Sequence, residues 1–436
     1  MDFRIEPQAV AGGTITVPGD KSVSHRALMF GSIADGTTRI GGFLAGEDCL
    51  ATLSACRAMG VAIESPDPTH VVVHGVGLHG LRAPRGELDL GNSGTAMRLM
   101  CGLLAGQPFD STLTGDASLS GRPMSRVIRP LEAMGASIES RGGKPPLCIR
   151  GGRTLTGIDY ALPMASAQVK SCVLLAGLYA AGRTTVREPA VTRDHTERML
   201  RTMGVTVDAD AGRVSLEGGQ ALSGSSIDVP ADLSSATFPM LAAIVAEEAE
   251  LVIENVGINP TRTGVLDILR AMGADVRLEN RRDLGGEPVA DLRVRSSRLT
   301  GGVVDPALVS LAIDEFPALF IAAAYARGRT TFSGLGELRV KESDRVAAMA
   351  QGLRTLGVAV DETPDGAVVH GGRLGGGIVE SHGDHRIAMA FAAGASAASG
   401  PVTVRDIAAV DTSFPGFGEL MRGIGLRIET EGGRGA

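Results

Sequence analysis

The stretch Leu269-Arg-Ala-Met-Gly273-Ala-Asp-Val276 marks the end of a helix and the start of a strand. Glycine can adopt the left-handed backbone conformation that ends a helix, and a β-branched residue soon after it favours an extended chain. Five further stretches have this form, with their glycines at Gly60, Gly135, Gly204, Gly357 and Gly425. The glycines recur at intervals of roughly 70 residues, longer than the roughly 20–50 residues of a solenoid repeat. We therefore interpret the unit as a folded α/β module that is used six times.

A second motif predicts the start of a helix in each module. Its first residues are small or polar, and Ser, Asp and Asn at such positions hydrogen-bond the free amides of the first turn. The first turn also carries a partial positive charge that suits an anion. Lys21, Arg26, Lys170 and Arg386 add cations to three of the starts, which predicts a pocket for a polyanionic small molecule. The six copies are Pro18-Gly-Asp-Lys-Ser-Val-Ser-His-Arg26, Gly91-Asn-Ser-Gly-Thr-Ala-Met-Arg98, Pro163-Met-Ala-Ser-Ala-Gln-Val-Lys170, Pro230-Ala-Asp-Leu-Ser-Ser-Ala236, Ile313-Asp-Glu-Phe-Pro317 and Gly383-Asp-His-Arg-Ile387.

The length and one long-range repeat predict two domains. A chain of 436 residues exceeds the roughly 250–300 residues at which a single core stops growing. The segment Val17-Pro18-Gly-Asp20 has a counterpart in Val229-Pro230-Ala-Asp232, about three modules later. We therefore expect one three-module domain over 18–230 and a second over 1–17 plus 231–436. A hinge is expected near 17–20 and 229–232, with a cleft between the domains.

Composition excludes several classes of function. The net charge of −7 argues against a nucleic-acid-binding surface, which is normally basic. Apolar runs such as Pro317–Ala326 are far shorter than the roughly 20 residues of a membrane helix, so no membrane association is expected. The N-terminus lacks the apolar core of a signal peptide. The five cysteines have no metal-binding spacing, which favours reduced thiols and a cytoplasmic location; they are Cys49, Cys56, Cys101, Cys148 and Cys172.

Two motifs have simpler explanations than the sites they suggest. Gly75-Val-Gly77-Leu-His-Gly80 matches a dinucleotide fingerprint, but no helix can begin at the Leu-Arg-Ala-Pro sequence that follows, so we interpret it as a turn. His382-Gly-Asp-His385 lacks a third metal ligand nearby in the sequence. We interpret Asp384 as a helix cap and Arg386 as an anion contact, and we expect no metal.

Charged residues at three places have both a structural and a functional interpretation. Lys21, Ser22 and Arg26 either cap a solvated helix or bind phosphate. Lys341 and Arg345, spaced i, i+4 on one helical face with Glu342 between them, form either an ion-pair network or an anion site with a carboxyl group for proton transfer. Asp314 is expected to cap a helix, and it could also act as a base if that helix start points into the cleft.

Together these motifs resemble the EPSP synthase (3-phosphoshikimate 1-carboxyvinyltransferase) family of the shikimate pathway, which serves aromatic amino-acid and chorismate biosynthesis. The resemblance implies an inside-out α/β barrel fold, with two domains of three βαβαββ-type modules and a two-stranded hinge. It implies no cofactor and no metal. The motifs that carry it, in chain order, are Pro18-Gly-Asp-Lys-Ser-Val-Ser-His-Arg26, Gly91-Asn-Ser-Gly-Thr-Ala-Met-Arg98, Gly121-Arg-Pro-Met124, Met164-Ala-Ser-Ala-Gln-Val-Lys-Ser171, Thr192-Arg-Asp-His-Thr-Glu197, Asn259-Pro-Thr-Arg-Thr-Gly264, Ile313-Asp-Glu-Phe-Pro317, Arg339-Val-Lys-Glu-Ser-Asp-Arg345 and Asp384-His-Arg-Ile-Ala-Met389.

The resemblance also implies the reaction, which transfers the enolpyruvyl group of phosphoenolpyruvate to the 5-hydroxyl of shikimate 3-phosphate and releases phosphate. Both substrates are anionic, so a site rich in Lys and Arg is needed. Asp314 would take the hydroxyl proton, and Glu342 and Lys21 are the candidates for the acid. Shikimate 3-phosphate would be bound by Lys21, Ser22, Arg26, Ser166, Ala167, Gln168, Arg193 and Lys341. Phosphoenolpyruvate would be bound by Lys21, Gly94, Arg122, Gln168, Arg345 and Arg386.

Some positions depart from the family pattern that is better known. Thr412 stands where many members carry a Lys near phosphoenolpyruvate, Glu337 replaces a common Asn, and Leu99 follows Arg98 where Pro is frequent. These features are similar to the class II bacterial subgroup. Gly94 is a glycine where some members of that subgroup carry Ala, and we therefore expect the chain to be sensitive to glyphosate, which binds in the phosphoenolpyruvate site of this family.

Two other functions are compatible with some of these motifs. The UDP-N-acetylglucosamine enolpyruvyl transferases share the fold, but that family calls for a cysteine in the loop before Gly121-Arg-Pro-Met124, and Leu113–Gly121 contains none. A non-catalytic repeat scaffold would not need Lys341, Glu342 and Arg345 beside Asp314.

A monomer is expected. Cations on both domains would repel each other until a dianionic substrate bridges them, so shikimate 3-phosphate is expected to close the domains.

Overall fold

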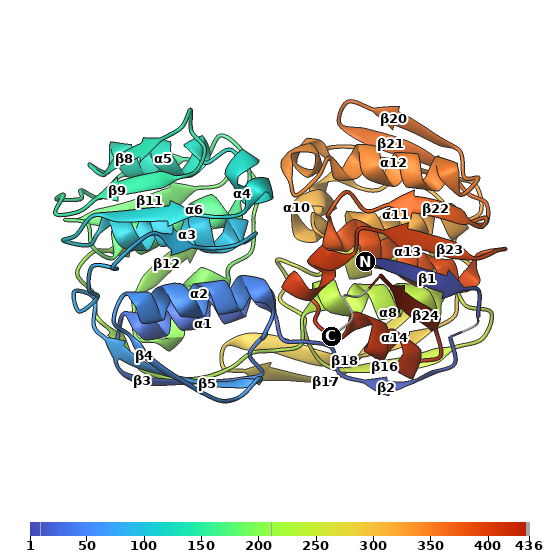
Figure 1. The fold of residues 1–436 in the computed structure, drawn as a ribbon, viewed down its shortest axis with the longest axis horizontal. Coiled ribbons are helices and arrows are strands. Elements are labelled where there is room, and N and C mark those ends of the chain that lie inside the picture. Colours follow the sequence, from blue (N-terminus) through green and yellow to red (C-terminus); the bar gives the residue numbers. More distant parts are fainter. Residues whose placement is uncertain (9, 211, 433–436) are drawn as a thin grey trace. The chain divides into compact units, whose positions relative to one another are not determined.

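The computed structural model describes residues 1–8, 10–210 and 212–432. The chain divides into two compact units (Figure 1). Unit 1 comprises Met1–Pro18, Pro230–Asp283 and Pro288–Ala436. Unit 2 comprises Gly19–Val229 and Leu284–Glu287. Each unit has its own apolar core, so each has the principal requirement for folding as a domain.

Three helices in each unit are almost entirely buried, namely α1, α3 and α6 in unit 2 and α8, α11 and α13 in unit 1. Most of their residues are apolar or small, as expected for helices with little contact to water. The helices of unit 2 are α1 (Lys21–Ser32), α2 (Glu47–Ala58), α3 (Gly94–Ala105), α4 (Ala117–Gly121), α5 (Ser125–Ala133), α6 (Ala167–Gly177) and α7 (His195–Thr202). Those of unit 1 are α8 (Leu233–Val245), α9 (Gly264–Ala271), η1 (Pro306–Leu308), α10 (Val309–Ala312), α11 (Phe316–Tyr325), η2 (Gly336–Val340), α12 (Arg345–Thr355), α13 (His385–Gly394), η3 (Ala395–Ala397), η4 (Ala408–Thr412) and α14 (Phe417–Gly423).

The strands of the described residues form six small sheets, three in each unit. In unit 2 the sheet orders are β14-β3-β5-β4, with β15 also on β3, β6-β7-β9-β8 and β10-β11-β13-β12. These strands are β3 (Ala34–Gly41), β4 (Ala62–Asp67), β5 (His70–Val76), β6 (Leu88–Asp89), β7 (Ser111–Thr114), β8 (Ser137–Ser140), β9 (Leu147–Arg150), β10 (Asp159–Ala161), β11 (Arg183–Arg187), β12 (Val207–Asp210), β13 (Arg213–Glu217), β14 (Leu222–Ser223) and β15 (Ser226–Asp228). Along each of these strand orders, one parallel pair is followed by two antiparallel pairs, and β15 adds a second parallel pair with β3 in the first sheet.

In unit 1 the sheet orders are β22-β23-β1-β24, β17-β18-β16-β2 and β19-β21-β20. The strands are β1 (Asp2–Glu6), β2 (Gly12–Ile15), β16 (Glu250–Gly257), β17 (Asp275–Leu284), β18 (Glu287–Arg295), β19 (Arg329–Phe332), β20 (Val360–Thr363), β21 (Gly366–His370), β22 (Gly377–Glu380), β23 (Val402–Arg405) and β24 (Arg427–Glu431). Strand β1 lies between β23 and β24, so the first and last strands of the described chain are neighbours (Figure 1). Strand β2 pairs with β16, and the first segment of the chain belongs to unit 1.

The helix-ending glycines behave as the sequence predicts. All six have positive φ values, between 84° at Gly357 and 105° at Gly135. A strand begins two or three residues after each of them, at β4, β8, β12, β17, β20 and β24. Residues 281–287 belong to the β17–β18 hairpin, which turns at Gly285 and Gly286. No helix within the described residues combines the length and the apolar composition needed to cross a membrane.

Candidate active site

Five of the six predicted helix starts have a side-chain cap. Asp20, Ser93 and Ser166 cap α1, α3 and α6, and Asp232 and Asp384 cap α8 and α13, each by accepting a hydrogen bond from a backbone amide of the first turn. The cap interpretation of Asp384 is therefore confirmed. These caps leave other amides of the first turns available, and such amides are a common component of anion sites.

Asp314 does not cap a helix, which corrects the sequence prediction. It lies in the turn between α10 and α11, and Glu315 occupies the N-cap position of α11 without a side-chain cap bond. Pro317 lies at the start of α11, where its missing amide removes one of the donors that a cap would satisfy. Asp314 is therefore not the N-cap residue of α11.

The start of α1 carries Lys21, Ser22 and Arg26, and their side chains behave differently. Lys21 is half-buried, and its Nζ donates to Asp48 Oδ2 at 3.0 Å. Arg26 is buried, and its Nε donates to Thr196 Oγ1 while Nη1 donates to the Ser22 carbonyl oxygen, both at 2.8 Å. Lys21 remains near the surface of unit 2, whereas Arg26 is built into its interior.

Lys170 does not supply a cation to an anion pocket, contrary to the sequence prediction. Its side chain is 1% exposed, and its Nζ lies 2.9 Å from Glu188 Oε2 and 2.8 Å from Glu197 Oε1. The same nitrogen donates to the Thr192 carbonyl oxygen at 3.2 Å. Two buried carboxylates therefore neutralise this charge.

The start of α3 brings two guanidinium groups close to one glycine. An ideal Cβ on Gly94 would lie 3.0 Å from Arg98 Nη1 and 3.1 Å from Arg122 Nη1. Both arginines are buried, and Arg98 Nη1 also donates to Gln168 Oε1 at 2.6 Å. Arg122 Nη2 donates to the side-chain oxygen of Asn92. Gly94, Arg122 and Gln168, predicted as site residues, are therefore brought together in unit 2.

Arg98 was not among the predicted site residues, although the sequence contains a signal for it. It lies four residues after Gly94 on α3, so the two positions are on the same face of the helix. A buried arginine beside a capped helix start is an unusual placement for a structural residue. The spacing of Gly94 and Arg98 is the signal in the sequence that predicts their proximity.

Ser166, Ala167 and Arg193 flank this region of unit 2. Ser166 caps α6 through a 3.4 Å contact from the Val169 amide to its Oγ, and Ala167 is the first residue of that helix. Arg193 is half-buried in the segment between β11 and α7. Burial lowers the pKa of Arg26 to about 10, and the charge of Arg193 contributes to this shift. Arg193 is therefore close enough to Arg26 for their charges to interact.

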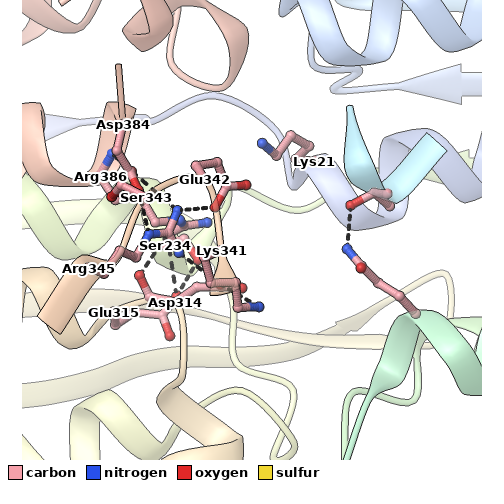
Figure 2. A network of polar contacts seen from close by, with 12 residues as sticks. Lys21, Ser234, Asp314, Glu315, Lys341, Glu342, Ser343, Arg345, Asp384 and Arg386 are labelled. Atoms are coloured by element: carbon pink, nitrogen blue, oxygen red, sulfur yellow. Dashed lines mark hydrogen bonds and ion pairs between the residues drawn. The ribbon is translucent and has the colours of Figure 1, made fainter. Parts of the chain in front are cut away.

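In unit 1, Arg345 is the centre of a buried charge network (Figure 2). Its Nε donates to Asp384 Oδ2 at 2.8 Å, its Nη2 donates to Glu342 Oε2 at 2.7 Å, and its Nη1 lies 3.4 Å from Asp314 Oδ1. Burial alone would lower the pKa of Arg345, but Asp384, Glu342 and Asp314 outweigh it and raise the pKa above its usual value. Arg345 is therefore a permanent positive charge beside Asp314.

Lys341 also reaches Asp314, with its Nζ 3.6 Å from Asp314 Oδ1. The two cations do not share a helical face, which corrects the i, i+4 prediction: Lys341 is the C-cap of η2, and α12 begins at Arg345 with Asp344 as its N-cap. A change of direction between two short helices, rather than one helix, brings Lys341 and Arg345 to the same carboxylate.

Arg386 holds the turn that carries Asp314. Its Nη1 donates to the Asp314 backbone oxygen at 3.1 Å and lies 3.9 Å from Glu315 Oε1 (Figure 2). Thr412, in the position where many family members carry a Lys, donates its hydroxyl to the Ala409 carbonyl oxygen at 2.7 Å. Thr412 thus satisfies a local backbone acceptor and supplies no charge.

Several of the cations are paired with carboxylates of their own unit. The pairs are Lys21 with Asp48, Lys170 with Glu188 and Glu197, Lys341 with Asp314, and Arg345 with Asp314, Glu342 and Asp384. Domain closure on substrate binding stays a prediction.

The fold and these two groups of residues define an α/β protein with buried arginines and a carboxylate suited to acid–base chemistry on an anionic ligand. Comparison with known proteins identifies the family. Residues 5–421 match the model of EPSP synthase (3-phosphoshikimate 1-carboxyvinyltransferase). The 3-phosphoshikimate 1-carboxyvinyltransferase of Alkalilimnicola ehrlichii is 62% identical over 98% of this chain and 96% of its own length. That of Methylococcus capsulatus is 59% identical over 98% of both chains.

A solved structure of EPSP synthase from Acinetobacter baumannii is 55% identical, with a TM-score of 0.88 over 98% of this chain and 99% of that one. The chain belongs to the EPSP synthase family. The family predicted from the nine sequence motifs is thus confirmed, together with a mixed α/β fold.

Proposed function

We propose that the chain transfers the enolpyruvyl group of phosphoenolpyruvate to the 5-hydroxyl of shikimate 3-phosphate and releases phosphate. Relatives at 57–62% identity over nearly the full length carry the name of this activity, which supports the enzyme class predicted from the sequence. The observation that carries the proposal is the Asp314 carboxylate, which lies 3.4 Å from Arg345 Nη1 and 3.6 Å from Lys341 Nζ. A carboxylate between two cations can accept a proton while the cations bind the anionic reactants.

The proposed substrate contacts are those that the resemblance implies. Shikimate 3-phosphate would be bound by Lys21, Ser22, Arg26, Ser166, Ala167, Gln168, Arg193 and Lys341, with Asp314 at its 5-hydroxyl. Phosphoenolpyruvate would be bound by Lys21, Gly94, Arg122, Gln168, Arg345 and Arg386. The approach of the Arg98 and Arg122 guanidinium groups to Gly94 supports an anion at the start of α3, because paired guanidinium groups bind carboxylate and phosphate well.

The proposed chemistry needs one base and one acid. Protonation of the methylene carbon of phosphoenolpyruvate makes C2 electrophilic, and the 5-hydroxyl oxygen adds to C2 as Asp314 takes its proton. The tetrahedral adduct then loses a methyl proton and phosphate, which restores the double bond in the product. Glu342, whose Oε2 accepts from Arg345, and Lys21, whose Nζ donates to Asp48, both remain candidates for the acid.

The finer description of the fold is part of this proposal. We infer an inside-out α/β barrel in each domain, built from three βαβαββ-type modules, over 18–230 and over 1–17 plus 231–436. The strand order that the unit 2 sheets share and the buried helices α1, α3 and α6 support this arrangement. A hinge near 17–20 and 229–232, a monomeric state and a cytoplasmic location complete the proposal.

Phosphate release tests the proposed function. The purified chain is incubated with phosphoenolpyruvate and shikimate 3-phosphate, with phosphoenolpyruvate and UDP-N-acetylglucosamine, or with phosphoenolpyruvate alone. We expect phosphate only in the first mixture. Release in the second mixture would identify the alternative enolpyruvyl transferase, and no release in any mixture would support a non-catalytic scaffold.

A further inference from the structure

Lys170, Glu188 and Glu197 form a buried charge cluster in unit 2 that is not among the proposed substrate contacts. We name these three residues the Lys170 cluster. Lys170 Nζ lies 2.9 Å from Glu188 Oε2 and 2.8 Å from Glu197 Oε1, and the three side chains are 1%, 2% and 1% exposed. Buried ion pairs contribute little net stability because each charge loses its hydration. A function other than stability is therefore a reasonable expectation for this cluster.

The cluster holds the backbone next to Arg193. Lys170 Nζ donates to the Thr192 carbonyl oxygen at 3.2 Å, and Thr192 Oγ1 donates to Glu188 Oε1. Thr192 and Arg193 lie in the segment between β11 and α7, which has no regular secondary structure of its own. The carbonyl and the hydroxyl of Thr192 are both bound to the cluster, so the cluster fixes the peptide from which Arg193 projects.

The cluster also ties this segment to the start of α6. Lys170 lies in the first turns of α6, four residues after Ser166, and Glu197 lies on α7. A second contact runs beside this ion pair, because Ser171 Oγ lies 2.7 Å from Thr196 Oγ1. Adjacent residues of α6 and α7 are thus linked twice, once by charge and once by hydroxyl groups.

Arg26 joins α1 to the same two helices. It donates to Thr196 Oγ1 and to Ser171 Oγ, both at 2.8 Å. The charge of Glu197 raises the pKa of Arg26, whereas the charge of Arg193 lowers it. Three elements that carry proposed contacts to shikimate 3-phosphate, namely the starts of α1 and α6 and the Arg193 segment, therefore meet at one buried network.

We propose that Lys170, Glu188 and Glu197 are positioning residues that set the Arg193 segment against the start of α6 for binding of shikimate 3-phosphate. This inference rests on the proposed function. A mobile Arg193 segment would lose conformational freedom when the ligand binds, and this loss would weaken binding. The Lys170 cluster fixes the segment in advance, so it strengthens binding without contacting the ligand. The cluster should therefore affect shikimate 3-phosphate and leave phosphoenolpyruvate almost unaffected.

Glu188→Gln is the decisive variant, because it keeps the shape of the side chain and removes one charge. We expect the Kd for shikimate 3-phosphate, measured by calorimetry on the full chain, to rise about tenfold, while the KM for phosphoenolpyruvate stays within about twofold. Arg193→Ala supplies a double-mutant cycle. If Glu188 acts through Arg193, the double variant should bind about as weakly as Arg193→Ala alone, whereas independent effects would multiply.

Two further variants keep the test open if Glu188→Gln does not fold. Thr192→Val removes only the hydroxyl that contacts Glu188 and should weaken shikimate 3-phosphate binding several-fold, about half of the Glu188→Gln effect on a logarithmic scale. Thr192→Ser keeps the hydroxyl and should restore binding. Asp208→Asn removes the exposed pair with Arg183 in the same unit and is the matched control, with no expected change.

The outcomes separate the inference from the proposed function. If the unmodified chain neither binds shikimate 3-phosphate nor releases phosphate, the proposed function fails. If it does both, a Kd within twofold of wild type for Glu188→Gln or for Thr192→Val overturns the positioning role. Multiplicative effects of Glu188→Gln and Arg193→Ala, or an equal rise in the KM for phosphoenolpyruvate, would overturn it as well.

Discussion

Replacing Gly94 by alanine tests why this position at the start of α3 lacks a side chain. Gly94 does not have a positive φ, so the backbone conformation alone does not require glycine. A Cβ would instead meet two side chains, at 3.0 Å from Arg98 Nη1 and 3.1 Å from Arg122 Nη1. Space beside the two guanidinium groups is therefore the reason that the structure gives for glycine here.

The distances set the size of the expected effect. Non-bonded heavy atoms prefer separations of about 3.5–4.0 Å, so each guanidinium must move by several tenths of an ångström. Arg122 is held by Asn92 and Ser118, which resists the movement. We expect the KM for phosphoenolpyruvate to rise about threefold, because a proposed ligand of that substrate moves. Glyphosate is the longer molecule, so its inhibition constant should rise by at least about thirtyfold.

The ratio of the inhibition constant to the KM is the quantity to measure. We expect it to rise at least about tenfold, or about 1.4 kcal/mol, in Gly94→Ala. Gly423→Ala is the control, because no atom lies within 4 Å of a Cβ at that position, and it should change neither constant. An unchanged ratio in Gly94→Ala would show that the methyl group does not distinguish inhibitor from substrate. Insensitivity of the unmodified enzyme to glyphosate would also refute the reasoning.

Three further predictions address the base, the buried arginine and a buried histidine. Asp314→Asn should lower turnover about 10²–10⁴-fold, and turnover within a few-fold of wild type in the folded variant would exclude Asp314 as the base. Arg345→Met should lower the free energy of unfolding in urea by about 3–5 kcal/mol, because it removes the cation that is paired with the buried Asp384 carboxylate, while Arg405→Met at an exposed pair should cost no more than about 1 kcal/mol. Burial, together with the charges of Lys21 and Arg26, lowers the pKa of His25 to about 3. The stability that the neutral, buried His25 contributes to the folded state is therefore present above pH 6.5, and it is lost as the pH falls toward 3. The chain should be about 2 kcal/mol less stable at pH 5 than at pH 7 through this group, and an equally large loss in His25→Gln would refute the assignment.

The features that the sequence predicted correctly are those decided by neighbouring residues. Each helix-ending glycine has a positive φ, and five of the six predicted starts have the expected polar cap. Whether a chain can turn, or whether a side chain can bind an amide of the next turn, depends on a few adjacent residues. Such features can be predicted without knowledge of the tertiary fold.

The wrong prediction for Lys341 and Arg345 shows how a local rule can be applied to the wrong element. The i, i+4 spacing places two residues on one face only if a single helix contains both. Asp344 accepts a hydrogen bond from the Ala347 amide and starts α12 after Lys341. An Asp before an apolar run was the same cap signal that identified the other helix starts, so this boundary could have been predicted.

Lys170 and Arg386 show where sequence reasoning reaches its limit. Both are cations near capped helix starts, and nothing in their local sequence distinguishes them. Lys170 is neutralised by Glu188 and Glu197, which lie 18 and 27 residues further along the chain, whereas Arg386 donates to the backbone of Asp314, 72 residues away. The function of a charged residue depends on which distant group the fold brings to it. A helix start can therefore suggest an anion site, but only the tertiary partners decide whether its cation binds a ligand or positions the residues that do.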